Sequence, residues 1–183
     1  MAPTAGARIA AVSTHLPTGW SSSAEAEARI ADESPGFRPP PGIVQRVTGI
    51  TGRHVMPDDW QASDLAVAAA GTLLSRQGLE VGDVDLLLFA SASQDLVEPA
   101  TAHIVAAALG AHCPVFDIKN ACNSVLNAVQ VGEALVRTEQ YRRVLVVSGE
   151  SPSRATRWRV RDLRQLAESF AGDTLSDAGA ALL

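Results

Sequence analysis

Cys122 is the residue whose type and position best suit covalent chemistry. It follows an apolar run at 115–118 that predicts a buried strand, and a segment with apolar residues at helical spacing, 123–137, begins directly after it. A thiol placed between a strand and a helix start lies near unpaired backbone N–H groups and the positive end of the helix dipole, which favour a thiolate. The pattern predicts a nucleophile, and the alternative is a small buried thiol without a chemical role.

The elements expected around this cysteine alternate between strands and helices. Apolar runs predict strands at 8–15, 85–90, 115–118, 144–148 and 178–183. Capping and periodicity predict helices at 21–30, 63–77, 101–109 and 123–137, and a helical turn at 43–47. Because the inner strands are apolar on both faces, the sequence predicts an α/β fold in which helices are layered on a mixed, mostly parallel five-stranded sheet.

Composition narrows the classes of function. The chain has 183 residues, is 46% hydrophobic and 19% charged, and carries a net charge of −5. These values predict a packed core and argue against a general nucleic-acid binder. No apolar run reaches the roughly 18–20 residues of a membrane span, and the N-terminus lacks the apolar region of a signal peptide. Two cysteines without metal-ligand spacing predict no metal site and a cytoplasmic protein.

Five stretches, in the same order along the chain, resemble segments of one enzyme family. They are Val-Thr-Gly-Ile-Thr-Gly-Arg-His-Val at 47–55, the strand and loop at 85–93, Pro-Ala-Thr-Ala-His-Ile-Val-Ala-Ala-Ala-Leu-Gly at 99–110, Phe-Asp-Ile-Lys-Asn-Ala-Cys at 116–122 and Ser-Asp-Ala-Gly-Ala-Ala-Leu-Leu at 176–183. On these residues the chain resembles the N-terminal half of a thiolase-fold condensing enzyme of the β-ketoacyl-acyl-carrier-protein synthase III type. The resemblance implies one thiolase-like half-domain over residues 1–183.

The resemblance also implies a reaction. Cys122 would accept an acyl group from acyl-coenzyme A or from the phosphopantetheine thioester of an acyl carrier protein, with no cofactor bound permanently. A second acyl substrate would then attack this thioester in a Claisen condensation. Such enzymes take their catalytic histidine and asparagine from a second half that these residues lack. We therefore expect a C-terminal half-domain, as a separate chain or segment, and a homodimer-type twofold partner.

Glu98 carries a more specific resemblance. It lies directly before Pro99 in the polar loop at 91–99. A glutamate at this place is similar to the one found in long-chain condensing enzymes of olefin and β-lactone biosynthesis, where it serves the neighbouring subunit. The resemblance implies a general base for the second acyl chain, and the alternative is a solvated loop glutamate.

An arginine-rich segment surrounds Trp158, with arginines at 154, 157, 159, 161 and 164. By resemblance, this region forms part of the coenzyme A mouth. Arg154, Arg157 and Trp158 are therefore candidates to hold coenzyme A phosphates and adenine, or the acidic face of a carrier protein. The alternatives are a solvated helix face paired with Asp162 and Glu168, or an interface with the missing half.

Other functions remain open from the sequence. One is acyl transfer to an oxygen or nitrogen acceptor without carbon–carbon bond formation. Another is a scaffold half without turnover. A Cys–His hydrolase that uses His103 or His112 is disfavoured, because no motif surrounds either histidine.

Overall fold

The computed structural model describes residues 6–183, and these residues form two compact units. The sheet unit comprises residues 6–15, 59–150 and 178–183, and the small unit comprises residues 16–58 and 151–177. The single half-domain over residues 1–183 therefore stays a prediction. None of the helices in the described residues is long and apolar enough to cross a membrane.

The sheet unit is built on a five-stranded sheet in the order β1-β7-β6-β4-β5. The central strand β4 is parallel to both β5 and β6, whereas β7 is antiparallel to β6 and β1. Four of the five strands therefore run in one direction, which confirms the mixed, mostly parallel sheet. The strands are β1 Val12–His15, β4 Leu86–Ala90, β5 Val115–Ile118, β6 Val144–Glu150 and β7 Ala178–Leu182.

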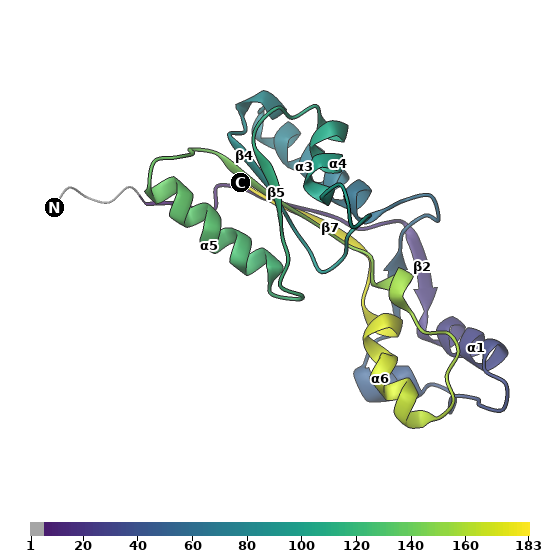
Figure 1. The fold of residues 1–183 in the computed structure, drawn as a ribbon. Helices are drawn as coiled ribbons and strands as arrows, with labels where there is room; N and C mark the ends of the chain where they lie inside the picture. Colours follow the sequence, from purple (N-terminus) through teal and green to yellow (C-terminus); the bar gives the residue numbers. More distant parts are fainter. Residues whose placement is uncertain (1–5) are drawn as a thin grey trace. The chain divides into compact units, whose positions relative to one another are not determined.

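Helices cover both faces of this sheet (Figure 1). On one face, α3 (Ala62–Gln77) and α4 (Thr101–Leu109) pack on alternate strand residues that include Leu87 and Phe89. On the other face, α5 (Ser124–Arg137) packs on Leu86 and Leu88. The alternation along β4 sends successive side chains to opposite layers, so both faces of this strand are buried, as its apolar run predicts.

Two glycines allow α3 to approach the sheet closely. A Cβ atom added to Gly149 of β6 would lie 1.8 Å from the Ala62 carbonyl oxygen. One added to Gly179 of β7 would lie 2.0 Å from the Leu65 carbonyl oxygen. The helix backbone therefore lies directly on the strand backbone at these positions.

The small unit joins a two-stranded antiparallel sheet to short helices. The pair is β2 (Gly19–Ser22) with β3 (Gly52–Val55). The core of this unit includes the buried residues Ile30, Val160 and Leu166. The remaining elements are α1 Ser23–Glu33, α2 Ile43–Thr48 and α6 Leu163–Thr174, with short 3₁₀ turns at Val81–Asp83 in the sheet unit and Pro152–Ala155 here.

Most expected elements are confirmed, with three omissions. Strands β2 and β3 and helix α6 were not predicted from the sequence. Residues 23–51 separate the two strands, so no hairpin turn signals their pairing. Helix α3 begins at Ala62 with Gln61 as its N-cap, whereas the sequence favours Ser63 or Asp64 as the cap. The Gln61 N–H donates to the Asp64 carboxylate in this first turn.

Candidate functional site

Cys122 lies in a tight turn between the end of β5 and the start of α5, as predicted. Its side chain is exposed. The residue before it, Ala121, has a φ of 46°, which is unusual for a residue with a Cβ atom. Helix α5 begins at Ser124 with Asn123 as its N-cap, so the thiol stands beside the helix N-terminus. The strained turn and the exposed thiol together form a candidate nucleophile site.

Hydrogen bonds hold this turn in place. The Ser124 hydroxyl accepts from the Asn120 N–H at 2.8 Å and donates to the Ala121 carbonyl at 2.7 Å. The Asn120 amide donates to the Asn127 side-chain oxygen at 2.7 Å, one turn further along α5. These contacts fix the backbone on both sides of Cys122 without using its thiol.

Cys113 differs from Cys122 in its surroundings. It is partly buried and packs against the α3 side of the core. Burial raises the pKa of the Cys113 thiol, which keeps it protonated. This cysteine is therefore a matched control for any reaction assigned to Cys122.

Glu98 is exposed on the loop between β4 and α4. Its neighbours Leu96 and Val97 are 54% and 84% exposed, and the Glu98–Pro99 peptide bond is cis. Among residues 6–183, no hydrogen bond or ion pair joins Glu98 to Cys122, and none joins a histidine to Cys122. The proposed pairing of Glu98 with a cysteine of a neighbouring subunit stays a prediction.

Three side chains that anchor the Glu98 loop were missed from the sequence. The Glu150 carboxylate accepts from the Ala92 N–H at 2.7 Å, the Ser93 N–H at 3.2 Å and the Ser93 hydroxyl at 2.9 Å. The other two are Asp117 of β5 and Lys119, which follows β5. The available signal was their position at the ends of parallel strands, where α/β proteins assemble their sites.

The arginine-rich segment belongs to the small unit. The Arg154 guanidinium donates to the Pro57 and Asp58 carbonyls at 3.1 and 2.7 Å and lies 3.7 Å from the Asp58 carboxylate. The ring of Trp158 faces the Arg29 guanidinium, 4.0 Å from its centroid. Arg157 is exposed. Arg154 and Trp158 thus have structural contacts that a bound ligand would have to exchange.

Buried charges also define the small unit. Asp177 is fully buried and accepts from the Met56 N–H at 2.8 Å, the Ser153 N–H at 3.0 Å and the Ser153 hydroxyl at 2.6 Å. These contacts hold the backbone at Met56 and Ser153 in place. Burial raises the pKa of Asp173 to about 6, although the Arg53 guanidinium opposes the rise. Burial also lowers the pKa of Arg53, whose Nε and Nη1 atoms are buried without a hydrogen-bond partner in the described residues.

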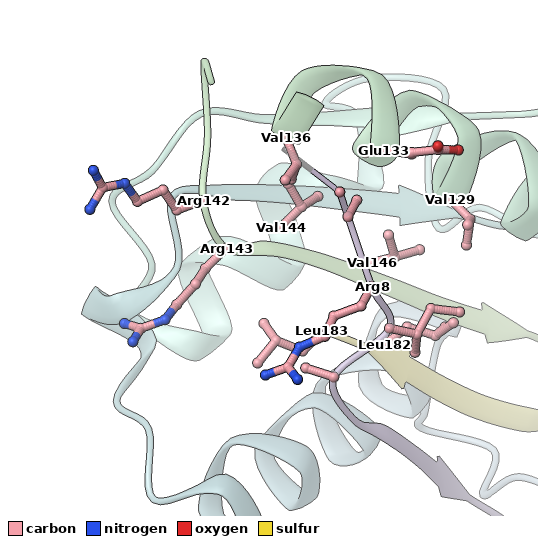
Figure 2. Close-up of a pocket in the computed structure, with 15 residues that line it drawn as sticks. Arg8, Val129, Glu133, Val136, Arg142, Arg143, Val144, Val146, Leu182 and Leu183 are labelled. Carbon is pink, nitrogen blue, oxygen red and sulfur yellow. The ribbon is translucent and has the colours of Figure 1, made fainter. Parts of the chain in front are cut away.

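A pocket of about 430 Å³ opens beside α5 in the sheet unit (Figure 2). Its walls combine apolar side chains with the charged residues Arg8, Glu133, Arg142 and Arg143. The valines of α5 face strand residues across the pocket, whereas the Arg142 and Arg143 side chains point away from it. The apolar lining includes Val129, Val136, Val144, Val146 and Leu182.

Comparison with known proteins gives a consistent family. Residues 116–183 match the family model of 3-oxoacyl-[acyl-carrier-protein] synthase III. The chain is 37% identical over 130 residues to the β-ketoacyl-[acyl-carrier-protein] synthase III of Vesicomyosocius okutanii, which covers 71% of this chain and 41% of that protein. It is 41% identical over 121 residues to the enzyme of Thiobacillus denitrificans, covering 65% and 38% of the two chains.

Solved structures show the same relationship. Cerulenin-bound OleA of Xanthomonas campestris superposes with a TM-score of 0.82 at 28% identity, covering 95% of this chain and 55% of that one. The acetamide-bound form gives a TM-score of 0.83 at 28% identity, with coverage of 98% and 58%. The chain therefore spans about half the length of the proteins that it matches.

Proposed function

Because the chain is a β-ketoacyl synthase III-like member of the thiolase superfamily that spans only part of the family's length, we propose that it is the acyl-accepting part of a condensing enzyme. The observation that carries the proposal is the exposed Cys122 on its strained turn at the start of α5. A thiol held there is open to an acyl thioester and close to backbone N–H groups. The only other cysteine in the sequence, Cys113, does not offer this arrangement.

The first step is a thioester exchange. The Cys122 thiolate attacks the carbonyl carbon of the acyl thioester, a new sulfur–acyl bond forms, and the thiolate of coenzyme A or phosphopantetheine leaves. The Cys122 N–H stands close to the oxyanion that develops on the carbonyl. In the second step, a carbanion of the other substrate attacks the acyl group and the Cys122 thiolate is released.

The second step needs groups that residues 6–183 do not bring to Cys122. By family resemblance, a histidine and an asparagine come from a C-terminal half, supplied by another chain or segment. The half-length coverage of the relatives supports this. So do the valines that line the pocket beside α5, together with Leu126 on the same helix, which is 67% exposed. We propose that the C-terminal half covers this face of the sheet unit and that the assembled enzyme is a twofold dimer.

Glu98 is proposed as the base that activates the second acyl chain. It is exposed beside two apolar side chains at the end of its loop, so a neighbouring subunit can bury it. Its substitution by alanine should leave Cys122 acylation intact and reduce condensation. Loss of both steps would contradict this division of roles.

Arg154, Arg157 and Trp158 are proposed to bind the acyl-coenzyme A substrate, and they differ in how available they are to it. Arg157 is exposed and available to a phosphate, whereas Arg154 already donates to backbone carbonyls and Trp158 already stacks with Arg29. Arg157→Glu should therefore raise the Michaelis constant for acyl-coenzyme A without changing the unfolding midpoint. An unchanged Michaelis constant would assign the segment a structural role.

The decisive experiment is intact-mass analysis after incubation with an acyl-coenzyme A, with and without the C-terminal half. The wild-type chain should gain one acyl group, and neutral hydroxylamine should remove it because the bond is a thioester. Cys113→Ala should gain the same group, and Cys122→Ser should gain no acyl group that hydroxylamine removes. Product analysis then separates condensation from acyl transfer to oxygen or nitrogen. A protein whose Cys122 stays unmodified in the assembled state is a scaffold instead.

A further inference from the structure

The loop of residues 91–100 carries Glu98 but contains no helix or strand. Irregular loops are usually the most mobile parts of a fold, whereas a base must be held within a fraction of an ångström of its target. The three residues at the loop tip, Leu96, Val97 and Glu98, are all exposed. Just before them, the Asp95 carboxylate accepts from the Ser63 N–H at 3.0 Å and the Asp95 N–H donates to the Thr101 hydroxyl at 3.3 Å. The position of Glu98 therefore depends on Asp95 and on contacts at the base of the loop.

Glu150, the last residue of β6, makes the first anchor. Its two carboxylate oxygens accept three hydrogen bonds from consecutive loop residues, Ala92 and Ser93, at 2.7, 3.2 and 2.9 Å. The Ser91 hydroxyl adds a bond to the Gly149 carbonyl at 2.7 Å. Hydrogen bonds to a carboxylate are stronger than neutral ones. A glutamine at 150 would keep one acceptor oxygen and turn its NH₂ group towards N–H donors.

Asp117 of β5 makes the second anchor, after the loop. Its carboxylate accepts from the Thr101 N–H at 3.0 Å and the Ala102 N–H at 2.7 Å. These are the first N–H groups of α4, whose own N-cap residue, Ala100, has no side-chain acceptor. A carboxylate from a neighbouring strand thus caps the helix and compensates its dipole.

Lys119 links the loop to the segment that bears the nucleophile. Its ammonium group donates to the Gln94 side-chain oxygen at 2.6 Å. Lys119 stands three residues before Cys122, and Gln94 stands four residues before Glu98. Because β4, β5 and β6 are parallel neighbours, the loop, the cysteine turn and Glu150 all lie beyond the same edge of the sheet.

From these contacts we infer that Glu150 and Asp117 are positioning residues that fix the Glu98 loop to the sheet, and that Lys119 sets this loop against the segment bearing Cys122. The inference rests on the proposed function for its catalytic consequence, but the anchoring itself does not. Since the resemblance directs Glu98 to the neighbouring subunit, its own subunit must hold the loop that presents it. Glu150 and Asp117 act through Glu98 and contact no substrate.

The anchoring is tested on the chain itself by amide hydrogen exchange. Glu150→Gln should raise the exchange rate of the Ala92 amide at least tenfold, because the glutamine offers one acceptor oxygen to donors that now use two. The Ser93 amide also donates to the Ser91 hydroxyl at 3.0 Å and should respond less, while amides in the middle of α3 keep their protection. Glu139→Gln is the matched control, since Glu139 is exposed after α5. Unchanged exchange at residue 92 in Glu150→Gln would overturn the inference, whatever the enzyme does.

The catalytic consequence is tested on the enzyme assembled with its C-terminal half. Glu150→Gln and Asp117→Asn should lower condensation at least tenfold and change Cys122 acylation less than twofold, which is the pattern expected of Glu98→Ala. Lys119→Met should do the same to a smaller extent, and Lys119→Arg should restore the rate because it keeps a cationic donor. A merely structural role would lower both steps together and would overturn the assignment.

The hydrogen-exchange and activity experiments distinguish failure of the proposed function from failure of the positioning role. If wild-type Cys122 accepts no acyl group, the proposed function fails, and the exchange rates alone decide the anchoring. If acylation proceeds and the Glu150 variant condenses at the wild-type rate, the proposed function stands and the positioning role falls.

Discussion

In the sheet unit, helix α3 lies directly on the backbone of two strands, at Gly149 and Gly179. In the small unit, by contrast, a buried guanidinium, Arg53, and two buried carboxylates, Asp173 and Asp177, occupy the interior. The first region is held by close apolar packing, which is insensitive to pH. The second is held by charged groups whose stability depends on protonation and on hydrogen bonds. The comparison predicts that the two units respond to different perturbations.

The largest expected effect concerns the close packing. Gly149→Ala would place a Cβ atom 1.8 Å from the Ala62 carbonyl oxygen, and backbone must move to admit it. We expect the free energy of unfolding to fall by about 3–5 kcal/mol, as measured by urea unfolding. Gly179→Ala should behave alike. A loss below about 1 kcal/mol would show that α3 can shift away from the sheet.

Asp177→Ala tests the small unit in the same way. The substitution leaves the Met56 and Ser153 N–H groups buried without an acceptor. We expect a loss of about 3 kcal/mol, detected by unfolding followed through tryptophan fluorescence, because two of the three tryptophans, Trp20 and Trp158, belong to this unit. Asp177→Asn should retain part of the stability, since its remaining oxygen still accepts.

Substitution of Asp173 should raise the free energy of unfolding, whereas substitution of Asp177 lowers it. Its folded pKa, about 6, lies above the ordinary value of 3.8, so the protonated form is favoured in the folded state. The resulting stability is present below about pH 4 and is lost as pH rises through about 6. Asp173→Asn should therefore stabilise the protein by about 1–2 kcal/mol at pH 7 and hardly at all at pH 4. An equal effect at both pH values would contradict the cause assigned to the shift.

The smallest effect is expected at Gly71, in the exposed face of α3. No atom lies within 4 Å of an added Cβ at this position. Gly71→Ala should stabilise the sheet unit by about 0.5–1 kcal/mol, measured by the same urea unfolding. With Gly149→Ala it forms a matched pair, because one glycine is required by packing and the other is not.

How much the sequence could predict also differs between the two units. In the sheet unit, local signals such as Gly78 and Gly110 mark helix ends, and apolar runs mark the strands. In the small unit, β2 and β3 pair through contacts between distant residues, with Gly52 lying against the Trp20 ring. Such a pairing depends on tertiary contacts that no local pattern records.

The same limit applies to the candidate site. The turn at Cys122 follows from a strand, a polar stretch and a helix in succession, so the sequence predicts it. Glu150 and Asp117 act on residues 57–58 and 15–16 positions away. Their partners are backbone N–H groups, which carry no side-chain signature. The nucleophile is thus readable from the sequence, whereas the anchors of the loop require the structure.

The place of β7 in the sheet has a consequence for the order of folding. This strand lies between β1 and β6, so residues 12–15 pair with residues 179–182. During synthesis, β1 emerges long before the strand that it needs, and until then β6 presents an open edge. The sheet closes only through contacts of very high sequence separation, which are slow to form. We therefore expect a nascent chain that stops before residue 178 to depend on chaperones, although its nucleophile turn is already complete.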